Sequence, residues 1–245
     1  MTQGAHWIQA DWAAPPGITA GCSLRTGGVS SGKFGSLNLG LHVGDDPVAV
    51  NENRERFVAG CGLPSAPLWL SQVHRTRVAR DPEPETEADA SVTSKAGLVL
   101  AVMVADCLPV LFASDDGTEV AAAHAGWRGL SAGVLENTVR AFDKPPRNLV
   151  AWLGPAISQA AFEVGDEVRQ AFIDWNAAVS DCFVRNDRDR WQADLYGLAR
   201  QRLQAIGVQR ISGGEFCTYA DAGRFFSYRR DGQCGRMAAF VFRSA

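Results

Sequence analysis

Apolar runs separated by polar segments extend along most of this 245-residue chain. The longest run, "AGLVLAVMVA" at residues 96–105, is about half the length that spans a bilayer, so it predicts a buried strand. Residues 97–113 and 119–127 are expected to form two apolar strands, with the turn signal "SDDGT" between them. Two further strands are expected at residues 68–79 and 148–158.

Helical spacing of apolar residues distinguishes other segments. Asp46 and Pro47 supply an N-cap and a first-turn proline, which predict a helix in the residues that follow. The apolar side chains of residues 129–142 recur on one side of a second predicted helix. Residues 163–175 and 193–208 have the pattern of amphipathic helices.

The remaining segments have the composition of loops and short strands. Residues 18–46 are rich in Gly and Ser around short β-like runs, and residues 211–243 mix strand and loop patterns. Residues 80–90, "RDPEPETEADA", are acidic and proline-rich, which predicts a solvated loop. Because no repeat, linker or break in composition divides the chain, we predict a single mixed α/β domain over residues 1–245, with β-sheets flanked by helices and a peripheral segment at about residues 1–15.

The composition is that of an ordinary globular protein. Hydrophobic residues make up 46% of the chain and charged residues 21%, and the formal net charge is -3. This balance creates no global positive field, so neither nucleic acid nor a membrane is an expected partner. The N-terminus lacks the basic and apolar regions of a secretory signal. The cysteines lack CxxC spacing, which favours reduced thiols in a cytoplasmic protein, and they are Cys22, Cys61, Cys107, Cys182, Cys217 and Cys234.

The histidines and one cysteine carry the candidate chemistry. His6 lies in the peripheral N-terminal segment and is the least favoured of the histidines. His74 ends a strand-like run, Cys107 follows Asp106, and His124 follows four apolar residues and precedes "AGWRG". A cysteine in an apolar strand most often packs as a small hydrophobe. Periodicity alone therefore gives neither the role of this thiol nor the convergence of the three side chains.

Two chemistries fit if His74, Cys107 and His124 converge. Two imidazoles and one thiolate leave a fourth position open, which is typical of a catalytic zinc site that activates water. A cysteine with a single histidine would instead be a nucleophile and its base. The second histidine favours the metal site.

Six ordered motifs resemble one known family. They are "SLNLGLHVGDDPVAVNENRERF", "LSQVH", "DASVTSKAGLVLAVMVADCLPVLF", "AAAHAGWRG", "WLGPAIS" with "FEVGDEV", and "FFSYRRDGQCGRMAAFVF". From about Arg25 to the C-terminus the chain closely resembles the YfiH family, also called the polyphenol-oxidase, laccase-domain or peptidoglycan editing factor family. The resemblance implies a YfiH-like, cysteine-hydrolase-type fold and a zinc site formed by His74, Cys107 and His124.

The resemblance also implies purine nucleoside chemistry, namely phosphorolysis of adenosine, inosine and methylthioadenosine and hydrolytic deamination of adenosine. An alternative is a peptidoglycan-precursor amidase that removes L-Ser from UDP-MurNAc-L-Ser, with Cys107 as nucleophile and His124 as base. Less favoured alternatives are a copper-dependent polyphenol oxidase and a non-catalytic metal- or nucleoside-binding protein. A chain with four histidines does not support a multicopper site, although a single site of two histidines and one cysteine can hold copper in place of zinc.

Phosphorolysis requires an anion site beside the sugar, because phosphate attacks the anomeric carbon. The glycine-rich run of residues 27–40 can offer backbone amides to an anion. Asp106, or less favourably Asp89, is a candidate to orient a ligand histidine, and Trp127 is expected to pack rather than stack on a purine. Candidate residues for binding nucleoside or phosphate are Arg25, Ser36, Asn38, His42, Arg54, Ser227 and Arg229, with Tyr228 and Arg230 beside them.

Overall fold

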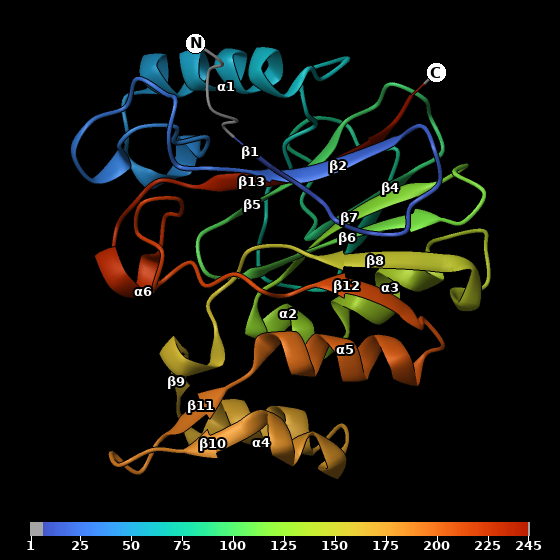
Figure 1. Ribbon diagram of the computed structural model, residues 1–245, viewed down its shortest axis with the longest axis vertical. Coiled ribbons are helices and arrows are strands. Elements are labelled where there is room, and N and C mark those ends of the chain that lie inside the picture. Colours follow the sequence, from blue (N-terminus) through green and yellow to red (C-terminus); the bar gives the residue numbers. More distant parts are fainter. Residues whose placement is uncertain (1–6, 245) are drawn as a thin grey trace.

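Residues 7–244, which the computed structural model describes, fold into stacked layers of sheet and helix (Figure 1). They form a four-stranded sheet, a six-stranded sheet and a small three-stranded sheet. The four-stranded sheet contains, in spatial order, β1 (Trp7–Gln9), β2 (Ile18–Ser23), β13 (Met237–Arg243) and β5 (Leu100–Val104). The six-stranded sheet contains β12 (Arg210–Gly213), β8 (Leu149–Leu153), β6 (Leu108–Ser114), β7 (Val120–Ala125), β4 (Ala90–Thr93) and β3 (Val78–Arg80). The small sheet contains β10 (Phe183–Arg185), β11 (Trp191–Ala193) and β9 (Glu163–Val164).

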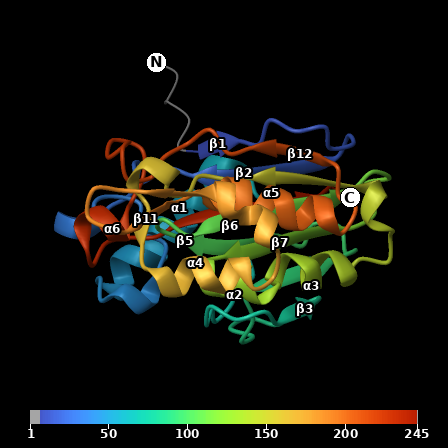
Figure 2. The same cartoon turned by 90° about the horizontal axis from the view of Figure 1, so that it is seen from below.

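Helices cover the outer faces of the two larger sheets. They are α1 (Pro47–Cys61), α2 (Trp127–Ala132), α3 (Val134–Arg140), α4 (Asp166–Ile173) and α5 (Leu195–Ala205), whereas the single turn α6 (Tyr228–Asp231) lies beside the sheets (Figure 1). In Figure 1, α1 lies above the four-stranded sheet, and Figure 2 shows α2, α3, α4 and α5 on the opposite side of the molecule. The predicted mixed α/β fold, with sheets flanked by helices, is therefore confirmed.

Apolar strands lie in the centre because both of their faces are covered. In β6, Leu111 belongs to the core between the two larger sheets, whereas Val110 and Phe112 belong to the core beneath the helices. A strand buried on both faces has a continuous apolar sequence rather than an alternating one. On the outer side of the four-stranded sheet, Phe57 of α1 meets Phe240 of β13 edge-on, with ring centroids 5.4 Å apart.

The predicted start of α1 is confirmed. The Asp46 side chain accepts a hydrogen bond of 3.0 Å from the backbone N–H of Val48, which is otherwise unpaired at a helix start. Gly62 ends the helix in a left-handed conformation with a φ of 60°. The predicted helices over residues 163–175 and 193–208 correspond to α4 and α5.

The segment predicted as one strand over residues 97–113 turns a corner. β5 ends at Val104 in the four-stranded sheet, and β6 begins at Leu108 in the six-stranded sheet. Asp106 lies at this corner with a φ of 85°, a left-handed conformation that costs energy for a residue with a side chain. The apolar pattern does not reveal the corner because the runs on either side are equally apolar. The corner places Cys107 at the passage from one sheet to the other.

Of the strand predicted over residues 68–79, the structure has only isolated β-bridges at Leu68 and Ser71 and the start of β3 at Val78. The backbone N–H groups of residues 73–75 bond to the carboxylate of Asp89 instead of to a neighbouring strand. His74 adopts a φ of 60° in this turn. A side chain from a distant segment therefore replaces the ladder that the sequence pattern predicts.

Two other predictions need adjustment. The helix predicted over residues 129–142 is divided into α2 and α3, because Gly133 adopts a φ of 99° between them. Of residues 18–46, all within the described part, only the first six form a strand, and the rest is a loop with two short 3-10 turns. The final block of residues 211–243 contains strands and loops as predicted, together with the short helix α6.

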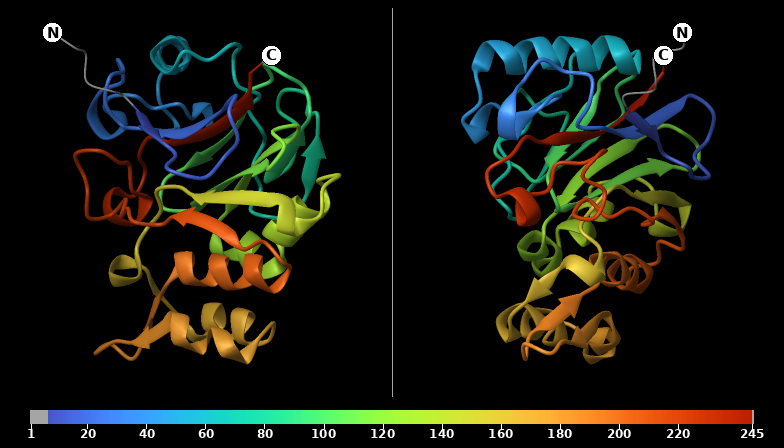
Figure 3. Two further views of the ribbon diagram at one scale, coloured as in Figure 1. Left: turned by 45° about the vertical axis from the view of Figure 1, so that its right-hand side comes forward. Right: turned by 60° about the vertical axis from the view of Figure 1, so that its left-hand side comes forward.

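The small sheet and α4 gather at one end of the molecule, beyond α5 (Figure 3). At the other end of the sequence, β1 is the outer strand of the four-stranded sheet, and His6 lies outside the described residues. Within residues 7–244, helices long and apolar enough to cross a membrane are absent. Each of the six cysteines has a free thiol, as the spacing predicts.

Candidate metal centre

Three side chains from separate elements meet at one point. His74 precedes β3, Cys107 lies at the corner between β5 and β6, and His124 lies near the end of β7. One ligand atom from each lies within 4.8 Å of the others. The two imidazole rings are nearly perpendicular, with centroids 4.8 Å apart. Because His74 is exposed and His124 is only 3% exposed, the group extends from the core to the surface.

Asp89 organises both histidines. Its carboxylate accepts hydrogen bonds of 3.2, 2.9 and 2.7 Å from the backbone N–H groups of residues 73–75. It also bonds to His124 Nδ1 at 2.8 Å, which leaves Nε2 facing Cys107 or a metal ion. Burial by itself raises the pKa of Asp89, but the bonds from His124 and the backbone hold that pKa below its usual value. Asp89 is fully buried, although it lies within residues 80–90, the segment predicted as a solvated loop.

Gly126 permits the close approach of Cys107 and His74. A Cβ atom at this position would lie 3.0 Å from Cys107 Sγ and 3.3 Å from His74 Cδ2. Contacts that short would require the Cys107 side chain or the His74 ring to shift by a few tenths of an ångström. The first glycine of "HAGWRG" therefore leaves the space in which these two side chains approach each other.

The protonation of Cys107 and His124 favours an ionised pair. Burial raises the pKa of the thiol, but the charge of His124 and hydrogen bonds from both histidines lower it to about 6. Burial lowers the pKa of His124, whereas the Cys107 thiolate and the bond to Asp89 raise it to about 9. A thiolate is thus available at neutral pH, which suits both metal ligation and nucleophilic attack.

A cavity of about 560 Å³ opens onto the three side chains. We call it the central cavity. Its lining includes a set of apolar side chains, which are Leu70, Met103, Val104, Ile157 and Phe162. Its polar and aromatic lining includes His42, Gln72, Tyr228, Arg229 and Arg236. An apolar pocket with a few convergent polar groups is the usual form of a small-molecule site.

The Asp106 carboxylate holds the rim of this cavity in place and does not orient a histidine. Its Oδ1 accepts a hydrogen bond of 2.6 Å from the Thr218 hydroxyl, and its Oδ2 accepts one of 2.6 Å from the backbone N–H of Arg229. The prediction that Asp106 orients a ligand histidine is therefore wrong, and Asp89 has that position. Asp106 is engaged elsewhere because the corner at residues 105–107 turns its carboxylate toward the loop that contains Thr218.

Arg25 and Ser36 were predicted to bind substrate or phosphate, but they brace a loop outside the central cavity. The Arg25 guanidinium donates to the carbonyl of Gly35 at 3.0 and 3.1 Å and to that of Ala222 at 3.0 Å. Ser36 Oγ accepts a hydrogen bond of 3.1 Å from the N–H of Gly28. These polar groups satisfy loop backbone that has no sheet partner.

Asn38 and Arg54 are likewise used within the fold. Asn38 is fully buried, and its Oδ1 accepts a hydrogen bond of 2.9 Å from the backbone N–H of Arg236. Arg54 Nε donates to the carbonyl of Leu39 at 3.0 Å, and its guanidinium stacks on Trp69 at 4.3 Å. Neither side chain lines the central cavity.

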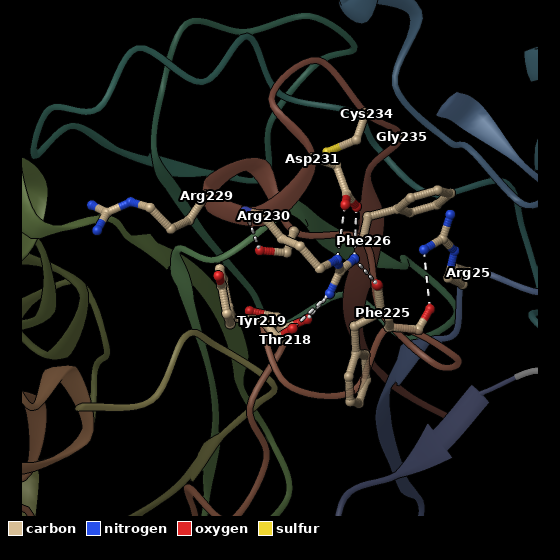
Figure 4. A network of polar contacts seen from close by, with 12 residues as sticks. Arg25, Thr218, Tyr219, Phe225, Phe226, Arg229, Arg230, Asp231, Cys234 and Gly235 are labelled. Carbon is tan, nitrogen blue, oxygen red and sulfur yellow. Dashed lines mark hydrogen bonds and ion pairs between the residues drawn. The ribbon is translucent and has the colours of Figure 1, made fainter. Parts of the chain in front are cut away.

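The two adjacent arginines of the motif "FFSYRRDG" have different surroundings. Arg230 donates to three backbone carbonyls and pairs with Asp231 at 2.7 Å, so it holds its own loop together (Figure 4). Ser227 is fully buried and caps α6 by accepting the N–H of Arg230 at 3.2 Å. The side chain of Arg229 extends away from this network in Figure 4, and it lines the central cavity.

Of the predicted substrate-binding residues, His42, Tyr228 and Arg229 thus line the central cavity. Arg236 and Gln72 also line it but were not predicted. Arg236 lies within the family motif "FFSYRRDGQCGRMAAFVF", and this position is the sequence feature that could have identified it as a lining residue. Burial and the charge of Arg236 lower the pKa of His42, so this ring is neutral at pH 7. Trp127 packs against the core beneath the six-stranded sheet, as predicted.

The chain is similar to known proteins over nearly its whole length. The sequence matches the family described as multi-copper polyphenol oxidoreductase laccase over residues 19–244. A protein of Escherichia coli (strain K12) named purine nucleoside phosphorylase YfiH is 54% identical over 238 residues, with 96% of this chain and 98% of that protein covered. The crystal structure of Neisseria meningitidis protein NMB0706 has a TM-score of 0.93 at 46% identity, with 98% of this chain and 100% of that chain covered. The crystal structure of YlmD from Geobacillus stearothermophilus has a TM-score of 0.92 at 30% identity, with 100% and 98% covered. The chain therefore belongs to the YfiH family, which is described as multi-copper polyphenol oxidoreductase laccase.

Proposed function

We propose that this chain is a zinc-dependent purine nucleoside phosphorylase. The observation that carries the proposal is the convergence of His74, Cys107 and His124, within 4.8 Å of one another, on a cavity of about 560 Å³. A cavity of that volume accommodates a molecule of nucleoside size. The relative that is 54% identical to this chain is named a purine nucleoside phosphorylase.

His74, Cys107 and His124 would hold the zinc ion. Imidazole and thiolate are ligands that zinc prefers, and the Asp89 carboxylate is bonded to the second ring nitrogen of His124, as is usual for a ligand histidine. The pKa of Cys107, lowered to about 6, supplies the thiolate. When bound, zinc supplies Lewis acidity at an oxygen of the substrate. The same donors can bind a single copper ion, but four histidines in the chain are too few for a multicopper centre.

The residues of the central cavity would bind the reactants. In phosphorolysis an oxygen of phosphate bonds to C1′ of the ribose while the bond from C1′ to N9 of the purine breaks. The electron pair of that bond leaves with the base, which takes up a proton. Arg229 and Arg236 bring positive charge to the cavity and would bind the phosphate. His42, neutral at pH 7, would form a hydrogen bond to the ribose.

The proposed nucleosides are adenosine, inosine and methylthioadenosine. Adenosine has a second proposed fate, which is hydrolytic deamination to inosine with release of ammonia. That reaction consumes water and not phosphate. Phosphate dependence therefore separates the two activities when both use the same cavity.

A second candidate function is the amidase reaction on UDP-MurNAc-L-Ser. One observation favours it, since the Cys107 thiolate beside a protonated His124 is the pair that a cysteine nucleophile requires. The cysteine-hydrolase type of fold implied by the family motifs agrees with this role. In that reaction Cys107 would attack the amide carbon, and His124 would protonate the leaving amine of L-Ser. The thioester would then be hydrolysed by water.

The test incubates purified protein with inosine or adenosine, with and without phosphate, and separates the products by chromatography. The proposal predicts hypoxanthine and ribose 1-phosphate from inosine only when phosphate is present. It predicts inosine from adenosine under both conditions. Absence of purine base in the presence of phosphate would overturn the phosphorylase proposal, and release of L-Ser from UDP-MurNAc-L-Ser by zinc-free protein would establish the amidase instead.

A separate variant tests the proposed binding of phosphate by Arg236. Arg236→Gln is expected to raise the KM for phosphate by about ten-fold or more, because a charged hydrogen-bond donor is lost. Arg147→Gln removes an exposed guanidinium outside the central cavity and is the matched control. An unchanged KM for phosphate in Arg236→Gln would remove this arginine from the phosphate site.

A further inference from the structure

Tyr228 exposes an aromatic ring inside the central cavity. The residue is 59% exposed, although most large apolar side chains of the described chain are buried. Single exposed hydrophobic residues on a convex surface need no explanation. Tyr228 differs because it lines the same cavity as His74, Cys107 and His124. Its ring is therefore in a position to contact a molecule held at the metal centre.

The backbone beneath this ring is fixed relative to Cys107. Tyr228 is the first residue of α6, a single turn capped by the buried Ser227. The next residue, Arg229, donates its N–H to the Asp106 carboxylate at 2.6 Å. Asp106 directly precedes Cys107 in the chain. These hydrogen bonds thus fix the backbone of Tyr228 relative to Cys107.

Arg236 holds the ring from one direction only. Its guanidinium carbon lies 6.0 Å from the centroid of the Tyr228 ring, at the outer limit of a cation–π contact. Its Nη1 is engaged with the carbonyls of Cys234 and Gly235 at 2.9 and 3.1 Å, which keeps the guanidinium in place. The Cβ of an alanine at residue 40 would meet Arg236 Cγ at 2.9 Å, so Gly40 also leaves the room this arginine occupies. With 59% of its surface exposed, Tyr228 keeps ring surface available to the cavity that it lines.

We infer that the Tyr228 ring is the stacking platform for the purine base of the substrate. This inference rests on the proposed function and names the residue that recognises the base. Planar aromatic bases stack on an exposed tyrosine, and the ring reads the flat face of a base rather than its hydrogen-bonding edge. The platform accordingly accepts adenine and hypoxanthine alike. It gives the protein selectivity for purine nucleosides over free ribose and ribose phosphates.

The test compares three variants in binding and turnover. Tyr228→Ser removes the ring, and Tyr228→Phe keeps the ring but removes the hydroxyl. Tyr219→Ser is the matched control, because Tyr219 is 41% exposed and lines a neighbouring cavity rather than the central one. The measurements are the Kd of inosine and of ribose by calorimetry, and kcat with the separate KM values for inosine and phosphate.

Tyr228→Ser is expected to raise the Kd and the KM for inosine by about ten-fold or more, since stacking on an aromatic side chain contributes that much to base affinity. The KM for phosphate and the weak binding of ribose should not change. Tyr228→Phe should restore inosine affinity to near the wild-type value, and Tyr219→Ser should match wild type. This split between the two KM values is not produced by a general loss of structure.

Two results would overturn the inference alone. One is wild-type inosine affinity in Tyr228→Ser. The other is equal weakening in Tyr228→Phe and Tyr228→Ser, which would assign the effect to the hydroxyl. A wild-type protein that binds and converts no purine nucleoside would overturn the proposed function and the platform together. The wild-type control therefore separates the two failures.

Discussion

One carboxylate oxygen of Asp89, Oδ1, forms a hydrogen bond of 2.8 Å to His124 Nδ1 and also accepts one of 2.9 Å from the backbone N–H of His74. One fully buried side chain thus fixes the ring of one histidine of the proposed metal centre and the main chain of the other. A carboxylate that bonds the non-ligating nitrogen of a histidine orients the ring and increases its basicity. Asp89 therefore supports the geometry of the proposed metal centre through both histidines.

Asp89→Asn is expected to lower zinc affinity by about 10- to 100-fold, because the amide keeps the shape but loses the negative charge that orients His124. The matched control is Glu87→Gln, which changes an exposed carboxylate two residues away. Competition against a chromophoric chelator measures the affinity of each variant. Equal affinity in Asp89→Asn and wild type would show that the Asp89 charge does not support the ligands.

Gly126→Ala is expected to impair metal binding without unfolding the protein. The added Cβ would lie 3.0 Å from Cys107 Sγ, so the sulfur would have to shift by a few tenths of an ångström from its position beside the histidines. Gly60→Ala is the control, since no atom lies within 4 Å of a Cβ there and a helical glycine replaced by alanine gains up to about 1 kcal/mol of stability. Metal content and thermal unfolding of both variants are the measurements. A Gly126→Ala protein with full zinc occupancy would contradict the packing argument.

The pH dependence of Cys107 alkylation tests the ionised pair in metal-free protein. The pKa of Cys107 is lowered to about 6, so the reactive thiolate persists at neutral pH and is lost as the pH falls through about 6. The rate of carbamidomethylation, followed at the Cys107 peptide by mass spectrometry, should have its midpoint there. His124→Asn removes the main stabilising charge and should move the midpoint upward. Cys22, whose pKa burial raises, should stay unmodified. A midpoint above 8 in wild type would exclude the pair.

Stability should depend on the buried ion pair between Arg202 of α5 and Glu136 of α3. The pair spans 2.7 Å, and the side chains are 4% and 8% exposed. Arg202→Ala leaves a buried carboxylate without its partner and is expected to lower the free energy of unfolding by about 3–5 kcal/mol. Arg210→Ala breaks the exposed pair with Asp115 and should cost at most about 1 kcal/mol. Urea unfolding measures both, and equal losses would refute the contrast.

Part of the metal centre follows from local sequence. The predicted turn "SDDGT" joins β6 and β7 and pairs Ala113 with Val120. The same antiparallel register places Pro109 opposite His124. That register brings Cys107, two residues earlier, beside the histidine. The arrival of His74 does not follow from any periodicity, because it depends on three backbone N–H groups that bond to a carboxylate 14 to 16 residues away.

The predicted anion site shows what sequence patterns leave open. Arg25 was a reasonable phosphate ligand by residue type, yet its guanidinium is used by the carbonyls of Gly35 and Ala222, the latter 197 residues away in sequence. Arg236 occupies the cavity instead, because Gly40 leaves room for its side chain. Whether an arginine binds a ligand or its own fold is decided by partners that are distant in the chain.

The most direct test of the central claim measures bound zinc and phosphate-dependent inosine cleavage in the same samples. The protein is stripped with a chelator, zinc is titrated back, and metal content is determined beside the rate of hypoxanthine release. We predict that the rate rises in proportion to bound zinc and saturates at one ion per chain, and that Cys107→Ser neither retains zinc nor regains activity. Full phosphorolysis by zinc-free protein, or by a Cys107→Ser variant without bound metal, would contradict the claim that His74, Cys107 and His124 form a catalytic zinc site.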